Sequence, residues 1–133
     1  MHRPRVLLAD DHADTAALLR LVLAPEFDVL AAVHDGPSLV TAALHLPADV
    51  ILIDITMPGL DGIAAAALIR EAKPDARIVF VTMHADTSIM ERAMATGALG
   101  YVLKLSAGDE LVPAVQAALC GKRYVSEGVD PSR

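Results

Sequence analysis

The sequence predicts an α/β fold built around a parallel β-sheet. Five short apolar runs rich in Val, Ile and Leu begin 22 to 28 residues apart, and each gap is long enough to hold a helix. Such runs, with little polar alternation, are typical of strands that are covered on both faces. A repeated strand–helix–strand pattern with right-handed crossovers makes the sheet parallel. We therefore expect a doubly wound domain with helices on both faces of a five-stranded sheet.

The expected strands and helices alternate along the chain. The strands are the apolar runs themselves, of which RVLLA is the first, and the helices are segments in which apolar residues recur at helical spacing. In order, the expected elements are strand 5–9, helix 13–24, strand 27–33, helix 36–46, strand 49–54, helix 61–73, strand 77–82, helix 85–98, strand 100–104 and helix 106–123.

Capping residues indicate where several of these helices begin and end. Asp35 or Ser38 can accept the free N–H groups at the start of the second helix. Gly97 and Gly121 are expected at the ends of the fourth and fifth helices, because glycine readily adopts the left-handed conformation that ends a helix. Pro113 lies inside the fifth helix, where it removes one backbone donor and is expected to bend the helix.

Composition limits the class of protein. A chain of 133 residues with 54% hydrophobic residues and a mean hydropathy of +0.46 is a packed globule. The domain is expected over 1–123, and the polar segment 124–133 is expected to be a linker stub or a disordered tail. A net charge of −6 disfavours direct nucleic-acid binding. No signal peptide or membrane span is visible, so we expect a cytoplasmic protein without a membrane partner.

Polar side chains follow four of the five expected strands. The first strand ends in Asp10 and Asp11, the third in Asp54, the fourth in Thr82 and the fifth in Lys104. All strands of a parallel sheet point their carboxyl ends to one edge, where open α/β sheets bind ligands. Each residue alone has an ordinary explanation as a helix cap or a solvated strand end. Their convergence on one edge favours a functional site.

The chemistry of this group favours a cation and a phosphoryl group. Three neighbouring carboxylates repel one another unless a cation joins them, and carboxylates without a His or Cys cluster favour Mg²⁺. Asp54 is then a candidate nucleophile, because a carboxylate can form an aspartyl-phosphate. Thr82 and Lys104 are suited to bind phosphoryl oxygens. We expect His12 to be only a first-turn residue of the helix that follows.

Four motifs give the chain a resemblance to a known family. LLADDH, VILIDITMPGLDG, IVFVTMH and GALGYVLK, in this order over residues 5 to about 123, resemble the receiver domain of two-component response regulators. The segments ADDH, TMHAD, GYVLK and AALCGKRYVSEGV resemble the NarL/FixJ (LuxR-type) subgroup of that family. The resemblance implies the flavodoxin-like receiver fold, with strand order 2-1-3-4-5 and five helices.

The resemblance also implies a role for each residue at the acidic end of the site. Asp54 would accept a phosphoryl group from a sensor histidine kinase. Mg²⁺ (or Mn²⁺) would be bound directly by Asp11, by Asp54 and by the backbone carbonyl of Thr56, and Asp10 would act mostly through water.

The same resemblance implies how the phosphoryl group is sensed. Lys104 would pair with it, Thr82 would hydrogen-bond it, and Tyr101, the aromatic switch residue, would turn inward with Thr82. Leu105 follows Lys104 where many receivers have a proline after a cis peptide bond, so the sequence leaves this geometry open. The positions at which the family tunes the lifetime of the phosphoryl group are held by Thr56, Met83 and His84.

The expected function is a phosphorylation-dependent signalling switch and not an enzyme, although the domain would assist its own phosphotransfer and dephosphorylation. It would regulate transcription, and contact DNA, only through a C-terminal helix-turn-helix domain that this sequence lacks. Phosphorylation is expected to promote a homodimer through Ile89, Met90 and Met94, unless these residues are core. The alternatives are a stand-alone receiver and a Mg²⁺-dependent phosphohydrolase. The second acid of the phosphohydrolases is replaced here by Thr56.

Overall fold

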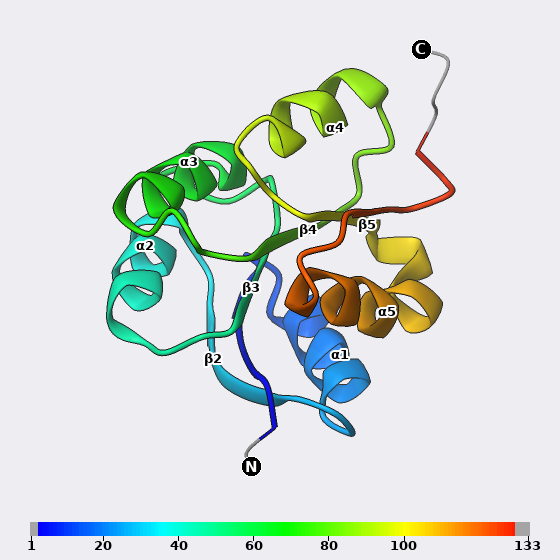
Figure 1. Cartoon of the computed structure of the whole chain (residues 1–133), viewed down its shortest axis with the longest axis horizontal. Helices are drawn as coiled ribbons and strands as arrows, with labels where there is room; N and C mark the ends of the chain where they lie inside the picture. Colours follow the sequence, from blue (N-terminus) through cyan, green and yellow to red (C-terminus); the bar gives the residue numbers. More distant parts are fainter. Residues whose placement is uncertain (1–2, 130–133) are drawn as a thin grey trace.

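The computed structural model describes residues 3–129 and has the predicted α/β architecture (Figure 1). All neighbouring strands are parallel, and their order is β2-β1-β3-β4-β5-β6. The strands are β1 (Arg5–Ala9), β2 (Asp28–Val33), β3 (Val50–Ile53), β4 (Ile78–Thr82), β5 (Gly100–Leu103) and β6 (Tyr124–Val125). The helices are α1 (Ala13–Leu23), α2 (Gly36–His45), α3 (Gly62–Ala72), α4 (Thr87–Met94) and α5 (Ala107–Leu119), with a 3-10 turn over Lys104–Ser106.

Helices cover both faces of the sheet, and each face has its own hydrophobic core. Alternate residues of a strand point to opposite faces, so neighbours such as Leu7 and Leu8 belong to different cores. One core packs under α1 and α5, and the other under α2, α3 and α4 (Figure 1). The strands β1, β3 and β4 are buried almost throughout. This double cover explains why they appear in the sequence as continuous apolar runs.

The helix ends follow the capping signals in part. Asp35 is the N-cap of α2, and its side chain accepts the N–H of Ser38 at 2.7 Å. Gly97 and Gly121 have φ values of +95° and +71°, as expected for residues beyond helix ends. Both helices stop earlier than predicted, because α4 ends at Met94 and α5 at Leu119. Glycine therefore marked the turn after each helix and not its last residue.

The segment after residue 123 differs from the expected linker or tail. Tyr124 and Val125 form β6, which pairs with Gly100 and Tyr101 of β5. The next residues are also held, because Ser126 and Val129 are buried. Residues 130–133 of the expected tail lie outside the described part of the chain. The sheet thus has one short strand more than the five that we expected, and the packed part of the domain continues to residue 129.

None of the helices within residues 3–129 is long and apolar enough to cross a membrane.

Candidate functional site

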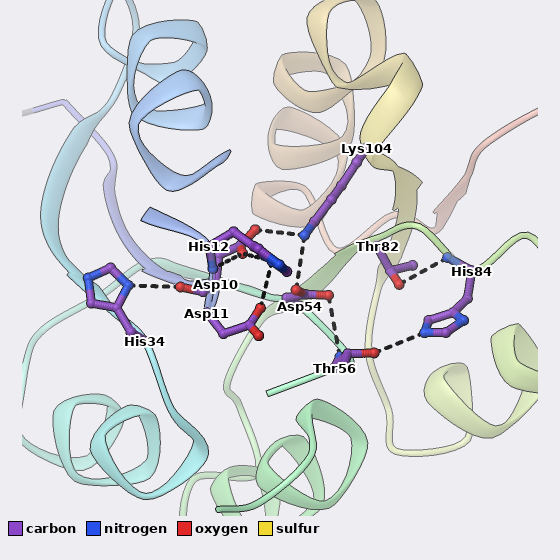
Figure 2. Close-up of polar contacts among 9 residues, drawn as sticks. All are labelled: Asp10, Asp11, His12, His34, Asp54, Thr56, Thr82, His84 and Lys104. Carbon is purple, nitrogen blue, oxygen red and sulfur yellow. Dashed lines mark hydrogen bonds and ion pairs between the residues drawn. The ribbon is translucent and has the colours of Figure 1, made fainter. Parts of the chain in front are cut away.

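The carboxyl edge of the sheet gathers the polar residues that follow the strands (Figure 2). Asp10 and Asp11 lie directly after β1, and Asp54 directly follows β3. Thr82 is the last residue of β4, and Lys104 directly follows β5. The structure therefore brings all five residues to the same edge of the sheet.

Lys104 joins two of the three carboxylates. Its Nζ lies 2.9 Å from Oδ2 of Asp10 and 3.0 Å from Oδ2 of Asp54. Both aspartates are nearly inaccessible, with 1% and 4% of their surface exposed. One ammonium group thus faces two buried negative charges, and the third carboxylate, that of Asp11, lies beside them. The site has an excess of negative charge.

The pKa values of Asp54 and Lys104 are both shifted by this buried, charged environment. Burial raises the pKa of the Asp54 carboxyl above its ordinary value, against the lowering effect of the Lys104 hydrogen bond. Burial alone would lower the pKa of Lys104, but its hydrogen bonds to Asp10 and Asp54 and their charges raise it. Lys104 therefore remains an ammonium group at neutral pH, and the Asp54 carboxyl loses its proton less readily than that of an exposed aspartate.

Asp54 is positioned by the close packing of α3 on its backbone. Its N–H donates to the carbonyl of Ala9 at 2.9 Å. A side chain at Gly62, the first residue of α3, would place its Cβ 2.1 Å from the carbonyl oxygen of Asp54. Glycine is therefore required there for steric reasons, which accounts for the last residue of the segment MPGLDG.

Asp11 and His12 complete the acidic end. Asp10 Oδ1 accepts the backbone N–H of His12 at 2.9 Å. Asp11 Oδ1 is buried without a hydrogen-bond partner in the described structure, although His12 Nδ1 is 2.9 Å away. One potential ligand atom from each of Asp10, Asp11, His12 and Asp54 lies within 4.8 Å of the others. The carboxylate oxygens of this cluster suit a hard divalent cation such as Mg²⁺.

His12 belongs to this cluster, although its position in the sequence predicts only a residue at the start of a helix. It is the N-cap residue of α1, but its side chain makes no capping hydrogen bond. The signal that could have revealed it is its position directly after the two adjacent aspartates.

The opposite side of the site is built from hydrogen bonds that converge on His84. The His84 N–H donates to Oγ1 of Thr82 at 3.2 Å, and its Nε2 is hydrogen-bonded to Oγ1 of Thr56 at 3.0 Å. Tyr101 donates its hydroxyl to the carbonyl of His84 at 2.7 Å. Tyr101 is completely buried, and burial raises its pKa to about 12. The tyrosine thus already points inward and closes this loop against β5.

Other predicted residues border the site. Met83 is 61% exposed, so its side chain lies at the surface beside Thr82. The peptide bond between Lys104 and Leu105 is trans. Among the residues expected to form a docking patch, Met94 is buried, and Ile89 and Met90 pack partly against the same core. This packing favours the core explanation for the three residues over an exposed patch.

Comparison with known proteins places these features in a family context. A family model for the response regulator receiver domain matches residues 6–116. The chain is 33% identical over 123 residues to the transcriptional regulatory protein DegU of Brevibacillus brevis, covering 91% of this chain and 52% of that protein. It is 36% identical over 124 residues to the transcriptional regulatory protein LiaR of Bacillus subtilis (strain 168), covering 89% and 57% of the two chains. The chain therefore spans a little over half the length of these relatives.

Solved structures agree with the sequence matches. A LuxR-family two-component response regulator from Aurantimonas sp. SI85-9A1 superposes with a TM-score of 0.89 at 34% identity, over 96% of this chain and 93% of that chain. The signal receiver domain of the putative response regulator NarL from Mycobacterium tuberculosis gives a TM-score of 0.84 at 31% identity, over 92% and 100% of the two chains.

Proposed function

This chain belongs to the response regulator receiver domain family, and on that premise we propose that it is a switch phosphorylated on Asp54. Its relatives are NarL/LuxR-family response regulators, which are signalling proteins. The observation that supports Asp54 is that its Oδ2 lies 3.0 Å from Lys104 Nζ while its Oδ1 makes only a long contact, 3.4 Å, with the Thr56 N–H; Asp10 also contacts Lys104, but its Oδ1 accepts the His12 N–H at 2.9 Å.

The proposed reaction is a phosphoryl transfer from a phosphohistidine of a sensor kinase. An oxygen of the Asp54 carboxylate forms a bond to phosphorus, and the bond between phosphorus and the imidazole nitrogen breaks. The imidazole leaves with the electron pair of that bond and takes up a proton, and Asp54 becomes an acyl phosphate. Lys104, which pairs with Asp54 Oδ2, is placed to follow the negative charge onto the phosphoryl oxygens.

Receiver domains bind Mg²⁺ at an acidic pocket, and the carboxylates of this chain fit such an ion. We assign direct binding to Asp11, Asp54 and the backbone carbonyl of Thr56, with Asp10 acting through water. Asp10 is nearly inaccessible and contacts Lys104 and the His12 N–H, whereas Asp11 is more exposed and its Oδ1 contacts the exposed ring of His12. A bound Mg²⁺ would offset the negative charge of the carboxylates and of the incoming phosphoryl group.

Thr82 and Tyr101 are the proposed sensors of phosphorylation. The Thr82 hydroxyl would bind a phosphoryl oxygen and draw the loop after β4 toward the site, and Tyr101 would hold that loop through the His84 carbonyl. Thr56, Met83 and His84 border the same space and are proposed to tune the lifetime of the acyl phosphate. This change is proposed to reach α4 and β5 and to promote a homodimer.

The output beyond this domain is a further proposal. A solved complex of RcsB with DNA, 28% identical to this chain, extends past the region that matches it, because 66% of that chain is covered. We propose that this chain regulates transcription through a C-terminal DNA-binding domain of the same kind.

The proposed homodimer is tested separately, by sedimentation with and without beryllofluoride and Mg²⁺, which mimic the phosphorylated state. A monomer in both states, up to roughly millimolar protein, would exclude the dimer.

The central test is labelling with acetyl phosphate. With Mg²⁺ present, intact-mass spectrometry should show the addition of one phosphoryl group, which Asp54→Asn should abolish. Asp75→Asn is the matched control, because Asp75 is an exposed aspartate away from the site and its loss should leave labelling intact. Labelling of the Asp54→Asn protein at another residue, in the same yield, would refute the assignment.

A further inference from the structure

The imidazole of His12 lies among the carboxylates of the acidic end (Figure 2). Its Nδ1 is 2.9 Å from Asp11 Oδ1 and 3.7 Å from Asp10 Oδ1. The side chain is 68% exposed. It is directed toward the carboxylates although neither the core nor the helix cap requires that orientation.

The short distance between His12 and Asp11 fits two arrangements, an ion pair of a protonated imidazole with the carboxylate and the approach of two ligand atoms to one cation. Asp11 Oδ1 and His12 Nδ1 lie 2.9 Å apart without forming a hydrogen bond of good geometry. An exposed ion pair of this kind contributes at most about 1 kcal/mol. Two atoms bound to one divalent cation at about 2.0–2.2 Å lie roughly 2.9–3.5 Å apart, at adjacent corners of its coordination shell. The observed 2.9 Å falls in that interval.

We propose that His12 Nδ1 is an additional, direct ligand of the divalent-cation site, and that it shifts the preference of the site toward cations that accept imidazole. The inference rests on the proposed function, because it requires the cation site at Asp10, Asp11 and Asp54. The atoms of His12, Asp11 and Asp54 that would bind the cation lie within 4.8 Å of one another. One cation spans about 4.2–4.4 Å between opposite ligands, so a side-chain movement of about half an ångström brings these three side chains to one cation, while Asp10 acts through water.

The chemical consequence concerns which cation the site selects. Carboxylate oxygens suit Mg²⁺ and Mn²⁺, whereas imidazole suits Zn²⁺ and other late transition metals. A neutral imidazole adds a strong donor without adding a further negative charge to a site that already has an excess. His12 should therefore increase the affinity for Zn²⁺ far more than the affinity for Mg²⁺.

The position of His12 is supported by the groups that hold its loop. Its backbone N–H is fixed by Asp10 Oδ1, and the Asp10 carbonyl is hydrogen-bonded to Nδ1 of His34 at 2.8 Å. Contacts of this kind orient the residues that bind a metal. The backbone of His12 is thus fixed beside the carboxylates, and its exposed ring can reach them.

The test measures cation binding directly, at one neutral pH, with Zn²⁺ and Mg²⁺ as probes. In calorimetry, His12→Ala should lower the affinity for Zn²⁺ by roughly 10-fold or more and the affinity for Mg²⁺ by less than about 3-fold. His45→Ala is the matched control, because it removes an exposed histidine of α2 whose ring contacts the Thr41 carbonyl. It should change neither value.

A spectroscopic measurement on the unmodified chain makes the test independent of the variants. In long-range ¹⁵N–¹H correlation spectra of the histidine rings, Zn²⁺ should shift the Nδ1 resonance of His12 to the position of a metal-bound nitrogen. An unshifted His12 ring in a protein that binds Mg²⁺ and is labelled by acetyl phosphate would overturn this inference and leave the proposed function intact. A chain that binds neither cation would overturn both.

Discussion

The two sides of the site satisfy their polar groups in different ways. On the acidic side, the ammonium group of Lys104 contacts two of the three carboxylates, and Asp11 Oδ1 has no hydrogen bond within the described chain. On the opposite side, the hydroxyls of Thr56, Thr82 and Tyr101 are all hydrogen-bonded to His84. The acidic side therefore needs a ligand to balance its charge, whereas the other side is stable without one.

This difference indicates how one site can both bind and signal. Like charges at short distance cost free energy that a bound cation recovers. The hydrogen bonds around His84 fix the loop between β4 and α4, so any group that competes for Thr82 must alter that loop. Binding energy is concentrated on one side and the conformational response on the other.

The strongest test of the acidic side is removal of Asp11. Asp11→Ala should lower the affinity for Mg²⁺ by more than about 100-fold, because a direct ligand is lost, and calorimetry measures it. Asp10→Ala should cost about 10- to 100-fold, as is typical of a residue that supports a ligand without touching the metal. Equal affinities for Mg²⁺ in both variants and in the unmodified chain would show that these acids only cap the helix.

The matching test of the other side is Thr82→Ala. This variant keeps Asp54 and the acidic cluster, so labelling by acetyl phosphate should persist. It should lose the response of the β4–α4 loop to beryllofluoride and Mg²⁺, an effect on the order of 1–3 kcal/mol of coupling. Amide chemical shifts of residues 83–90 measure that response. Thr82→Ser retains the hydroxyl and should retain the shift changes, whereas a full response in Thr82→Ala would refute the role of Thr82.

A smaller effect is expected on stability when one acidic charge is removed. In EDTA at neutral pH, Asp54→Asn should raise the free energy of unfolding by roughly 0.5–2 kcal/mol, because it relieves repulsion in a buried site. Urea unfolding followed by circular dichroism gives the value. Asp75→Asn is again the control and should be neutral. A destabilised Asp54→Asn protein would mean that the ion pair with Lys104 outweighs the repulsion.

The smallest effect is expected from Tyr101→Phe, which loses one hydrogen bond of about 1 kcal/mol. Its signature is the dependence of stability on pH. The folded pKa of Tyr101 is raised from 10.0 to about 12, so its contribution to stability is full below pH 10 and is lost as pH rises through 12. The phenylalanine variant should lose less stability over that interval. The free energy of unfolding of both proteins is measured by urea titration between pH 10 and 12. An equal decrease in the two proteins would show that ionisation of Tyr101 does not cause the loss of stability.

The fold and much of the site could be predicted because strong local signals carry them. Strands buried on both faces must be continuously apolar, so β1, β3 and β4 can be recognised as strands from the sequence alone. Residues directly after such strands must meet at one edge, which is why the grouping of Asp10, Asp54 and Lys104 followed from spacing. The roles of these residues came from the resemblance and still await the experiments above.

Two features could not be predicted because their signals are not local. The strand β6 has two residues, and its pairing with β5 depends on a register that only the folded sheet defines. The orientation of His12 depends on the backbone after Asp10, and a histidine at a helix start is otherwise unremarkable. The strand β6 and the orientation of His12 both depend on contacts between different parts of the fold, which the residue pattern within a single helix or strand does not show.

The packing of residues 124–129 against β5 also determines where this domain can be truncated without loss of stability. Ser126 donates its N–H to the Tyr101 carbonyl at 2.8 Å, and its Oγ accepts the N–H of Leu103 at 3.0 Å. A chain that stopped at Arg123 would leave these backbone groups of β5 bare and would uncover the apolar surface under Val129. An open, unpaired sheet edge is a template on which other chains can add strands. With β6 in place the edge of the sheet is a strand of two residues in place of the four-residue β5, and a very short edge strand is one way in which proteins limit such pairing.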